Sequence, residues 1–238
     1  MHKMEMRIRY SECATDNRLK ISSIINYFQD CTTENSEKLG VGFLYLKDRK
    51  RAWLLNFWQV KICRRPEVFE KVEVSTWATG FNGILGPRDF LMETPDGEML
   101  ACAHSLWVYV DTETGRPTKP TQEEIEAYMQ EAPLPFEQAP RKIILPESAV
   151  EVEHISVRRY HLDTNDHVNN CQYVQVAMEV LPKEFEVAEV RVEYRKAATL
   201  GDTLILRMAE ENNKVVVGVC DEEGKPYAIV EFIGETKR

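Results

Sequence analysis

Apolar residues recur with helical spacing at two places in the chain. Both sets approximate the i, i+3, i+4, i+7 pattern that gives a helix one apolar face. The first set is Ile21, Ile24, Ile25 and Phe28, and the second is Val174, Ala177, Met178 and Leu181. Gly40 and Pro182 are suited to end the two helices. The pattern predicts two helices, and packing against a core explains both apolar faces without a ligand.

Strand-like runs follow each predicted helix. In the first half these runs are residues 52–62, 71–79, 88–94 and 99–110. In the second half they are residues 188–194, 202–209, 214–220 and 226–233, rich in β-branched side chains. Pro95, Asp96 and Gly97 separate one pair of runs and residues 221–224 another, as hairpin turns do. Each half therefore reads as one helix followed by an antiparallel sheet.

The two helix regions resemble each other in layout. Residues 9–30 and residues 159–179 both begin with Arg-Tyr, continue with a polar turn and then enter the predicted helix. The two segments are aligned here at Leu19 and Val168. Few identities support the match. The layout predicts an α+β unit used twice.

Prolines mark the join between the halves. Six of the eleven prolines fall between Pro117 and Pro146, a density that prevents a long helix or a central strand. One short helix is predicted near residues 122–130. We expect an N-terminal domain over residues 1–135, a linker over 136–150 and a C-terminal domain over 151–238.

Composition and charge narrow the class of protein. A hydrophobic share of 43% and a charged share of 29% are those of a globular protein, and no apolar run approaches the ~20 residues that span a bilayer. The first residues lack the apolar stretch of a secretory signal, which predicts a cytoplasmic location. The net charge of −9 argues against nucleic acid as a partner. Six scattered cysteines read as reduced thiols, and neither a metal nor an organic cofactor is expected.

The segment 163–170, Asp-Thr-Asn-Asp-His-Val-Asn-Asn, gathers the groups that carry chemistry. Each residue alone has a structural explanation, because Asn caps helices and Asp completes turns. Together, an imidazole with acidic and amide neighbours at a helix start is what acyl transfer uses. The imidazole can relay a proton, a carboxylate can orient it or activate water, and N–H groups at the helix start can receive an oxyanion.

Here the chain resembles the acyl-acyl-carrier-protein (acyl-ACP) thioesterases of plants and bacteria. The string D-x-N-x-H-V-N-N followed by Tyr173 is similar to the signature of that family. Further landmarks in the same order extend the resemblance over about residues 5–235. They are the residues at 18–23, 27–30 and 39–41, Trp77, the residues at 88–90 and 105–107, Asp111 and the residues at 114–117.

The resemblance implies a double hot-dog fold, with a long helix wrapped by an antiparallel sheet in each half and one active site in the C-terminal half. Asp163, Asn165 and His167 would be the catalytic set. Asn165 and His167 would hold the thioester or its attacking water, and Asp163 would orient or activate them. The implied activity is release of free fatty acid from acyl-ACP, with the acyl chain in an apolar tunnel lined partly by the N-terminal half.

One departure from the family pattern concerns the catalytic acid. Plant members carry a Glu-Cys pair where this chain has Ala197 and Ala198. Either Asp163 alone supplies the base or another acid does. Glu193 would lie roughly 13 Å from Ala197 along an extended strand. Cys171 follows the motif directly, and we expect it to serve packing.

Several alternatives stay open. An acyl-coenzyme A thioesterase of the same fold presents the same pantetheine arm, and a non-catalytic acyl-binding protein could keep the fold. A dehydratase would need a different loop pattern. Four basic clusters are either solvated surface or docking points for an acidic carrier protein: residues 49–51, 64–65, 158–159 and 195–196. Acyl chain length and homodimer formation are not decided by the sequence.

Overall fold

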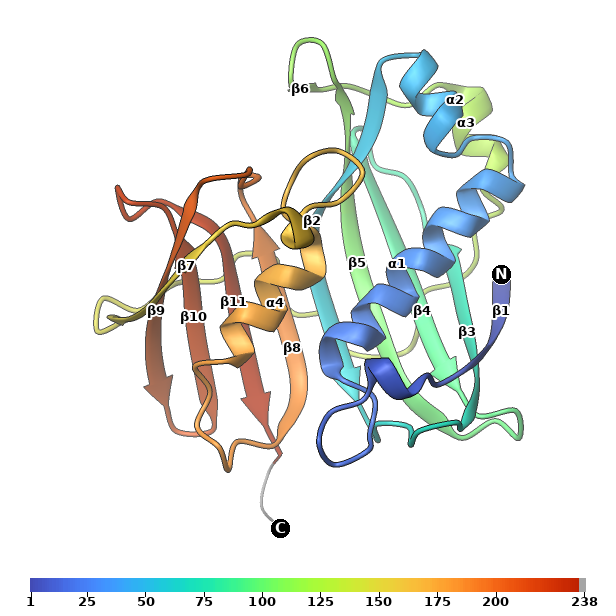
Figure 1. Ribbon diagram of the computed structural model, residues 1–238. Helices are drawn as coiled ribbons and strands as arrows, with labels where there is room; N and C mark the ends of the chain where they lie inside the picture. Colours follow the sequence, from blue (N-terminus) through green and yellow to red (C-terminus); the bar gives the residue numbers. More distant parts are fainter. Residues whose placement is uncertain (236–238) are drawn as a thin grey trace. The chain divides into compact units, whose positions relative to one another are not determined.

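The computed structural model describes residues 1–235 and divides into two compact units. Unit 1 comprises Met1–Asn56 and Ile62–Gln138, and unit 2 comprises Phe57–Lys61 and the chain from Ala139 onward. In each unit a helix lies against one face of an antiparallel sheet (Figure 1). The predicted α+β class and the double use of one helix-and-sheet unit are therefore confirmed.

Unit 1 is built around the long helix α1. Its elements are β1 (His2–Arg7), η1 (Tyr10–Glu12), α1 (Ile21–Lys38), α2 (Phe43–Asp48), β2 (Arg51–Ile62), β3 (Lys71–Ala78), β4 (Leu85–Glu93), β5 (Met99–Asp111), β6 (Arg116–Pro117) and α3 (Gln122–Ala127). The strand order is β1-β3-β4-β5, and β6 pairs with β5. The predicted apolar face of α1 is buried, and the rings of Phe28 and Phe90 lie 5.2 Å apart. Gly40, at a φ of 74°, follows the helix as expected.

Unit 2 repeats the design with a shorter helix. Its elements are β7 (Val150–Ser156), η2 (Arg159–His161), α4 (Asn170–Met178), β8 (Val187–Tyr194), β9 (Thr203–Glu211), β10 (Lys214–Cys220) and β11 (Pro226–Gly234). The order runs from Phe57–Lys61 of β2 through β8-β11-β10-β9 to β7. Val174 and Ala177 are fully buried, but Leu181 lies beyond the helix, so the predicted stripe is too long. Pro182 lacks the N–H that would continue the helix, and it disfavours helical geometry at Leu181.

The first strand of each repeat was not predicted. β1 pairs only with β3 in unit 1, β7 pairs only with β9 in unit 2, and both strands consist mostly of polar residues. Met4 and Met6 in β1, and Val150 and Val152 in β7, do alternate with charged residues. That alternation is the signal of a half-exposed strand, and the high polar content obscured it.

The proline-rich connector crosses the sheet face that the helices leave uncovered. After α3, which ends at Ala127 rather than near residue 130, side chains of the sheet bind the connector backbone. In unit 1 the N–H of Leu134 donates to Asp89, whose other carboxylate oxygen lies 2.7 Å from Nδ1 of His104. In unit 2 the N–H of Ile143 donates to Glu193 over 2.9 Å. Polar side chains on this face are thereby hydrogen-bonded although they are shielded from water.

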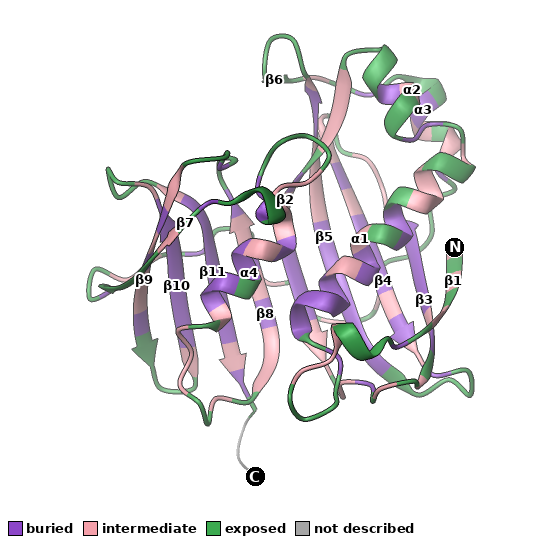
Figure 2. Ribbon diagram, in the orientation of Figure 1, coloured by how far each residue is buried: buried purple, intermediate pink, exposed green. Residues whose placement is uncertain are grey.

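Burial extends over both faces of the strands β10 and β11, in which every residue from Val215 to Cys220 and from Tyr227 to Phe232 is buried (Figure 2). All six cysteines lie in the described residues and are thiols, four of them buried, as predicted. Within residues 1–235, no helix is long and apolar enough to cross a membrane, and no three His, Cys, Asp or Glu side chains gather as metal ligands.

Candidate functional site

The sequence motif forms a tight turn between η2 and α4. The N–H of Asp163 donates to the carbonyl oxygen of His167 over 2.8 Å, and Leu162 pairs with Val168 outside that bond. Asp166, at the tip, has a φ of 59°, a left-handed conformation that Asp and Asn tolerate. The three predicted catalytic residues therefore lie within one closed loop of five residues.

The carboxylate of Asp163 holds the backbone of this turn. Its Oδ1 accepts the N–H of Asn165 at 2.8 Å and the N–H of His167 at 3.4 Å. Asp163 is partly buried, whereas the side chains of Asn165 and His167 are exposed. A carboxylate has about four acceptor positions, so Asp163 keeps capacity for a further partner while it orders the turn.

The loop after β8 lies directly beside His167. His167 pairs with Thr199 across a short antiparallel bridge, and the N–H of Val168 donates to the carbonyl of Ala198 over 2.9 Å. Asp202 accepts both the N–H and the hydroxyl of Thr199, at 2.8 and 3.1 Å. Ala197 and Ala198, where the family resemblance implies Glu and Cys, thus belong to the segment that contacts the motif.

Several residues near the start of α4 have structural rather than chemical roles. The side chain of Asn169 accepts the N–H of Cys171 at 2.9 Å, which is the helix cap expected of Asn. Cys171 is 2% exposed and fits the predicted packing role. Glu193 accepts the N–H of Ile143 on the connector, whereas its neighbour Tyr194 contacts Tyr173 of α4. Since successive strand residues face opposite ways, Glu193 points away from α4.

His161 lies two residues before the sequence motif and is not among the predicted site residues. It is buried, and its Nδ1 accepts the N–H of Arg158 at 3.0 Å. Burial, and secondarily the charge of Arg158, lowers the pKa of His161 below 6.5, its usual value. His161 is therefore a neutral structural imidazole that anchors the chain just before the motif. The sequence signal for this role is the position of His161 in the turn that precedes the helix.

Unit 1 contains the same turn without its chemistry. The N–H of Ala14 donates to the carbonyl of Arg18 over 2.8 Å, and Asn17 has a φ of 62°. Cys13 pairs with Leu19, as Leu162 does with Val168. At the positions of Asp163, Asn165 and His167, the first repeat has Ala14, Asp16 and Arg18. Of these two turns, only the one in unit 2 carries the predicted catalytic set.

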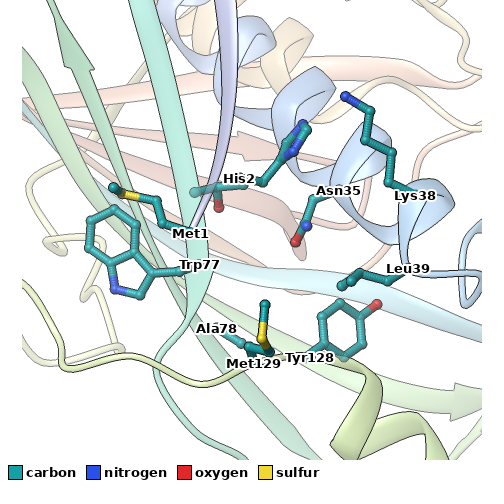
Figure 3. Close-up of a pocket in the computed structure, with 10 residues that line it drawn as sticks. Met1, His2, Asn35, Lys38, Leu39, Trp77, Ala78, Tyr128 and Met129 are labelled. Atoms are coloured by element: carbon teal, nitrogen blue, oxygen red, sulfur yellow. The ribbon is translucent and has the colours of Figure 1, made fainter.

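A pocket of about 200 Å³ is lined only by residues of unit 1, none of them from the motif (Figure 3). This volume is below the roughly 300 Å³ at which pockets for small molecules begin. Three of its lining residues, Asn35, Thr76 and Tyr128, also hold the buried guanidinium of Arg88 by hydrogen bonds and ring stacking. Burial lowers the pKa of Arg88 to about 10, so it stays charged. The pocket is explained by the packing of α1 on the sheet.

Comparison with known proteins agrees with this description. The models of the acyl-ACP thioesterase N-terminal domain and C-terminal domain match residues 1–128 and 145–230. A chloroplastic palmitoyl-acyl carrier protein thioesterase of Cuphea hookeriana is 30% identical over 82% of this chain and 51% of its own length. A chloroplastic palmitoyl-acyl carrier protein thioesterase of Gossypium hirsutum is 28% identical, over 89% and 56%.

Solved structures show the same fold. An acyl-ACP thioesterase of Bacteroides thetaiotaomicron superposes with a TM-score of 0.90 at 20% identity, covering 98% of this chain and 97% of that one. A 12:0-ACP thioesterase of Umbellularia californica gives 0.86 at 24% identity, over 99% and 97%. The predicted double hot-dog fold is confirmed, although the helix of the second half is short. The chain belongs to the acyl-ACP thioesterase family.

Proposed function

We propose that this protein hydrolyses acyl thioesters and releases free fatty acid from acyl-ACP, the step that ends fatty acid synthesis. The chain spans about half the length of the curated relatives it matches, so their activity is taken over here as a proposal. The observation that carries it is the closed turn that presents Asn165 and His167 to solvent on a backbone held by Asp163.

The residues of the turn divide the chemistry as follows. Asn165 and His167 hold the thioester carbonyl or the attacking water, and His167 relays the proton. Water adds to the carbonyl carbon, and the carbon–sulfur bond then breaks. The acid leaves with the water oxygen, and the carrier thiol leaves with a proton. Asp163 keeps the backbone of Asn165 and His167 in register and supplies the carboxylate of the site. With Ala at 197, the turn's Asp163 is the acid we assign to base chemistry.

Four finer predictions accompany this function. The division at residues 1–135, 136–150 and 151–238 is proposed as the domain plan of the chain. The carrier is proposed to be ACP rather than coenzyme A, because the family models that match are described by that carrier. A cytoplasmic location and a homodimer stay predictions from the sequence.

The deciding experiment is hydrolysis of C4 to C18 acyl thioesters of ACP and coenzyme A. The wild type, His167→Ala and Arg18→Ala are compared, because Arg18 occupies the position of His167 in the other repeat. We expect free fatty acid from the wild type and from Arg18→Ala, and none from folded His167→Ala. Faster release from coenzyme A at every length would reject ACP as the carrier. No release from any thioester, with an acyl ligand still bound, would instead identify an acyl-binding protein.

A further inference from the structure

The structure separates the four basic clusters by whether their charges are neutralised. In the cluster at residues 49–51, two of the three cations contact an acid or an aromatic ring. Arg51 forms an ion pair with Asp111, and Arg49 stacks on the ring of Tyr45. Of this cluster only Lys50 has no acidic or aromatic partner within the described chain. A single exposed lysine is ordinary surface.

The clusters at 64–65 and 195–196 are fully paired. Arg64 binds Glu70 and Glu98 at 2.9 and 2.7 Å, and Arg65 pairs with Asp16. Arg195 lies 3.1 Å from Glu193, and Lys196 pairs with Asp221. Cations committed to neighbouring carboxylates present little net charge to a partner.

Arg158 and Arg159 differ from all of these. Both are exposed, and in residues 1–235 neither forms an ion pair with a carboxylate. Asp202, whose carbonyl accepts the N–H of Val157, uses its carboxylate to accept the N–H and the hydroxyl of Thr199. A pair of adjacent exposed arginines without an acid is notable in a chain of net charge −9.

Comparison of the two repeats shows what removed the acid. Arg9 occupies the position of Arg158 in the first repeat, and its guanidinium lies 3.8 Å from Glu12. The position of Glu12 is taken in the second repeat by His161, which is buried with a lowered pKa and therefore neutral. The same local fold thus keeps its arginine paired in one repeat and unpaired in the repeat that carries the motif.

Two exposed apolar side chains adjoin these arginines. Tyr160 is 78% exposed and Leu200 is 52% exposed. The backbone of Val157 bonds to Gly201 and Asp202, which places the loop of Leu200 beside Arg158. The same loop contains Thr199, the partner of His167. Arg158, Arg159, Tyr160 and Leu200, termed the arginine patch below, therefore border the motif.

We propose that the arginine patch docks the acidic surface of the carrier protein that delivers the acyl thioester. This rests on the proposed function and assigns its partner a binding surface. A protein of net charge −9 repels an acidic partner overall, so a local unneutralised cationic site is needed to attract and orient it. Arginine and tyrosine are also the side chains that most often dominate the energy of an interface. The bordering motif then receives the thioester from the docked carrier.

The test compares Arg158→Glu/Arg159→Glu with Lys183→Glu. Lys183 is exposed and follows the far end of α4, so its reversal changes charge away from the motif. Binding of holo-ACP to each protein is measured by surface plasmon resonance at several salt concentrations. Hydrolysis of acyl-ACP and of the matching N-acetylcysteamine thioester is measured alongside.

We expect the double variant to bind holo-ACP at least about tenfold more weakly, with a flatter salt dependence, and Lys183→Glu to bind like the wild type. The loss of kcat/KM in the double variant should be about tenfold greater on acyl-ACP than on the N-acetylcysteamine thioester. Arg158→Lys/Arg159→Lys, which keeps the charge, should recover most of the binding. Equal binding by the wild type and the double variant, or equal losses on both substrates, would overturn the docking proposal. Arginine-dependent binding without hydrolysis would reject the proposed function and leave the docking surface standing.

Discussion

The hydroxyl of Tyr173 accepts a 2.9 Å hydrogen bond from the backbone N–H of Ala198. Both residues are buried, and burial raises the pKa of Tyr173 to about 12, so the hydroxyl stays neutral. Ala198 is also the residue whose carbonyl binds Val168, next to His167. The buried side chain of Tyr173 in α4 thus sets the position of the loop that contacts the motif, in addition to packing in the core.

Replacing Tyr173 by Phe should destabilise the protein by about 1–3 kcal/mol. The substitution leaves the N–H of Ala198 buried without its acceptor, while the ring and its packing remain. Urea unfolding measures the change. Tyr160→Phe is the control, because its hydroxyl is exposed and its loss should cost less than about 0.5 kcal/mol. Equal stabilities of the two variants would show that water replaces the Tyr173 bond.

Asp163→Asn should separate the structural role of Asp163 from its chemical one. The Asn side chain keeps an oxygen that can accept the N–H groups of Asn165 and His167, but it has no charge. We expect nearly wild-type stability and a kcat reduced about 100-fold or more. Asp163→Ala should lose the turn as well and unfold at lower denaturant. Full activity of Asp163→Asn would exclude this carboxylate as the base.

Ala197→Glu should increase hydrolysis. The side chain is exposed, two residues before the partner of His167, and the family resemblance implies a Glu at this position. A second carboxylate beside the motif is expected to raise kcat about tenfold or more by orienting the imidazole or the water. Ala197→Gln tests whether charge is needed, because it has nearly the same shape. A gain of the same size with Gln would point to packing, and no gain with Glu would show that Asp163 suffices.

His161 should make stability depend on pH on the acidic side of neutrality. Its pKa is lowered in the folded state, so between that value and 6.5 the unfolded chain binds a proton that the folded protein does not. Stability is therefore fully present above the unfolded pKa and falls as the pH drops through this window. His2, whose pKa is also lowered by burial, contributes in the same direction.

The measurement is the free energy of unfolding of the wild type and His161→Gln from about pH 8 to about pH 5. We expect a flatter profile for His161→Gln, with His2 accounting for part of the slope that remains. His154→Gln, at an exposed site, serves as the control. Parallel profiles for the wild type and His161→Gln would mean that His161 does not titrate differently in the two states.

Elements with strong local patterns could be predicted from the order of residues alone. The apolar spacing from Ile21 to Phe28 specified α1, Gly40 specified its end, and the hairpins at Gly97 and Gly224 specified adjacent strands. The sequence also located the motif at 163–167 and the family, because both depend on residue identity in a fixed order. The weakly apolar strands β1 and β7 were not predicted, because both are rich in charged residues and six of the seven residues of β7 are exposed.

The partners of these residues depend on how distant segments pack in the fold. Pairing of His167 with Thr199, and of Ala198 with Tyr173, joins segments separated by more than twenty residues, and sequence spacing does not encode such contacts. The four basic clusters are alike in residue type. In the fold, Arg64 and Arg195 form ion pairs with nearby carboxylates, whereas Arg158 and Arg159 form none within the described residues. Charge becomes available for binding when no neighbour neutralises it, and neighbours are fixed by packing of distant segments.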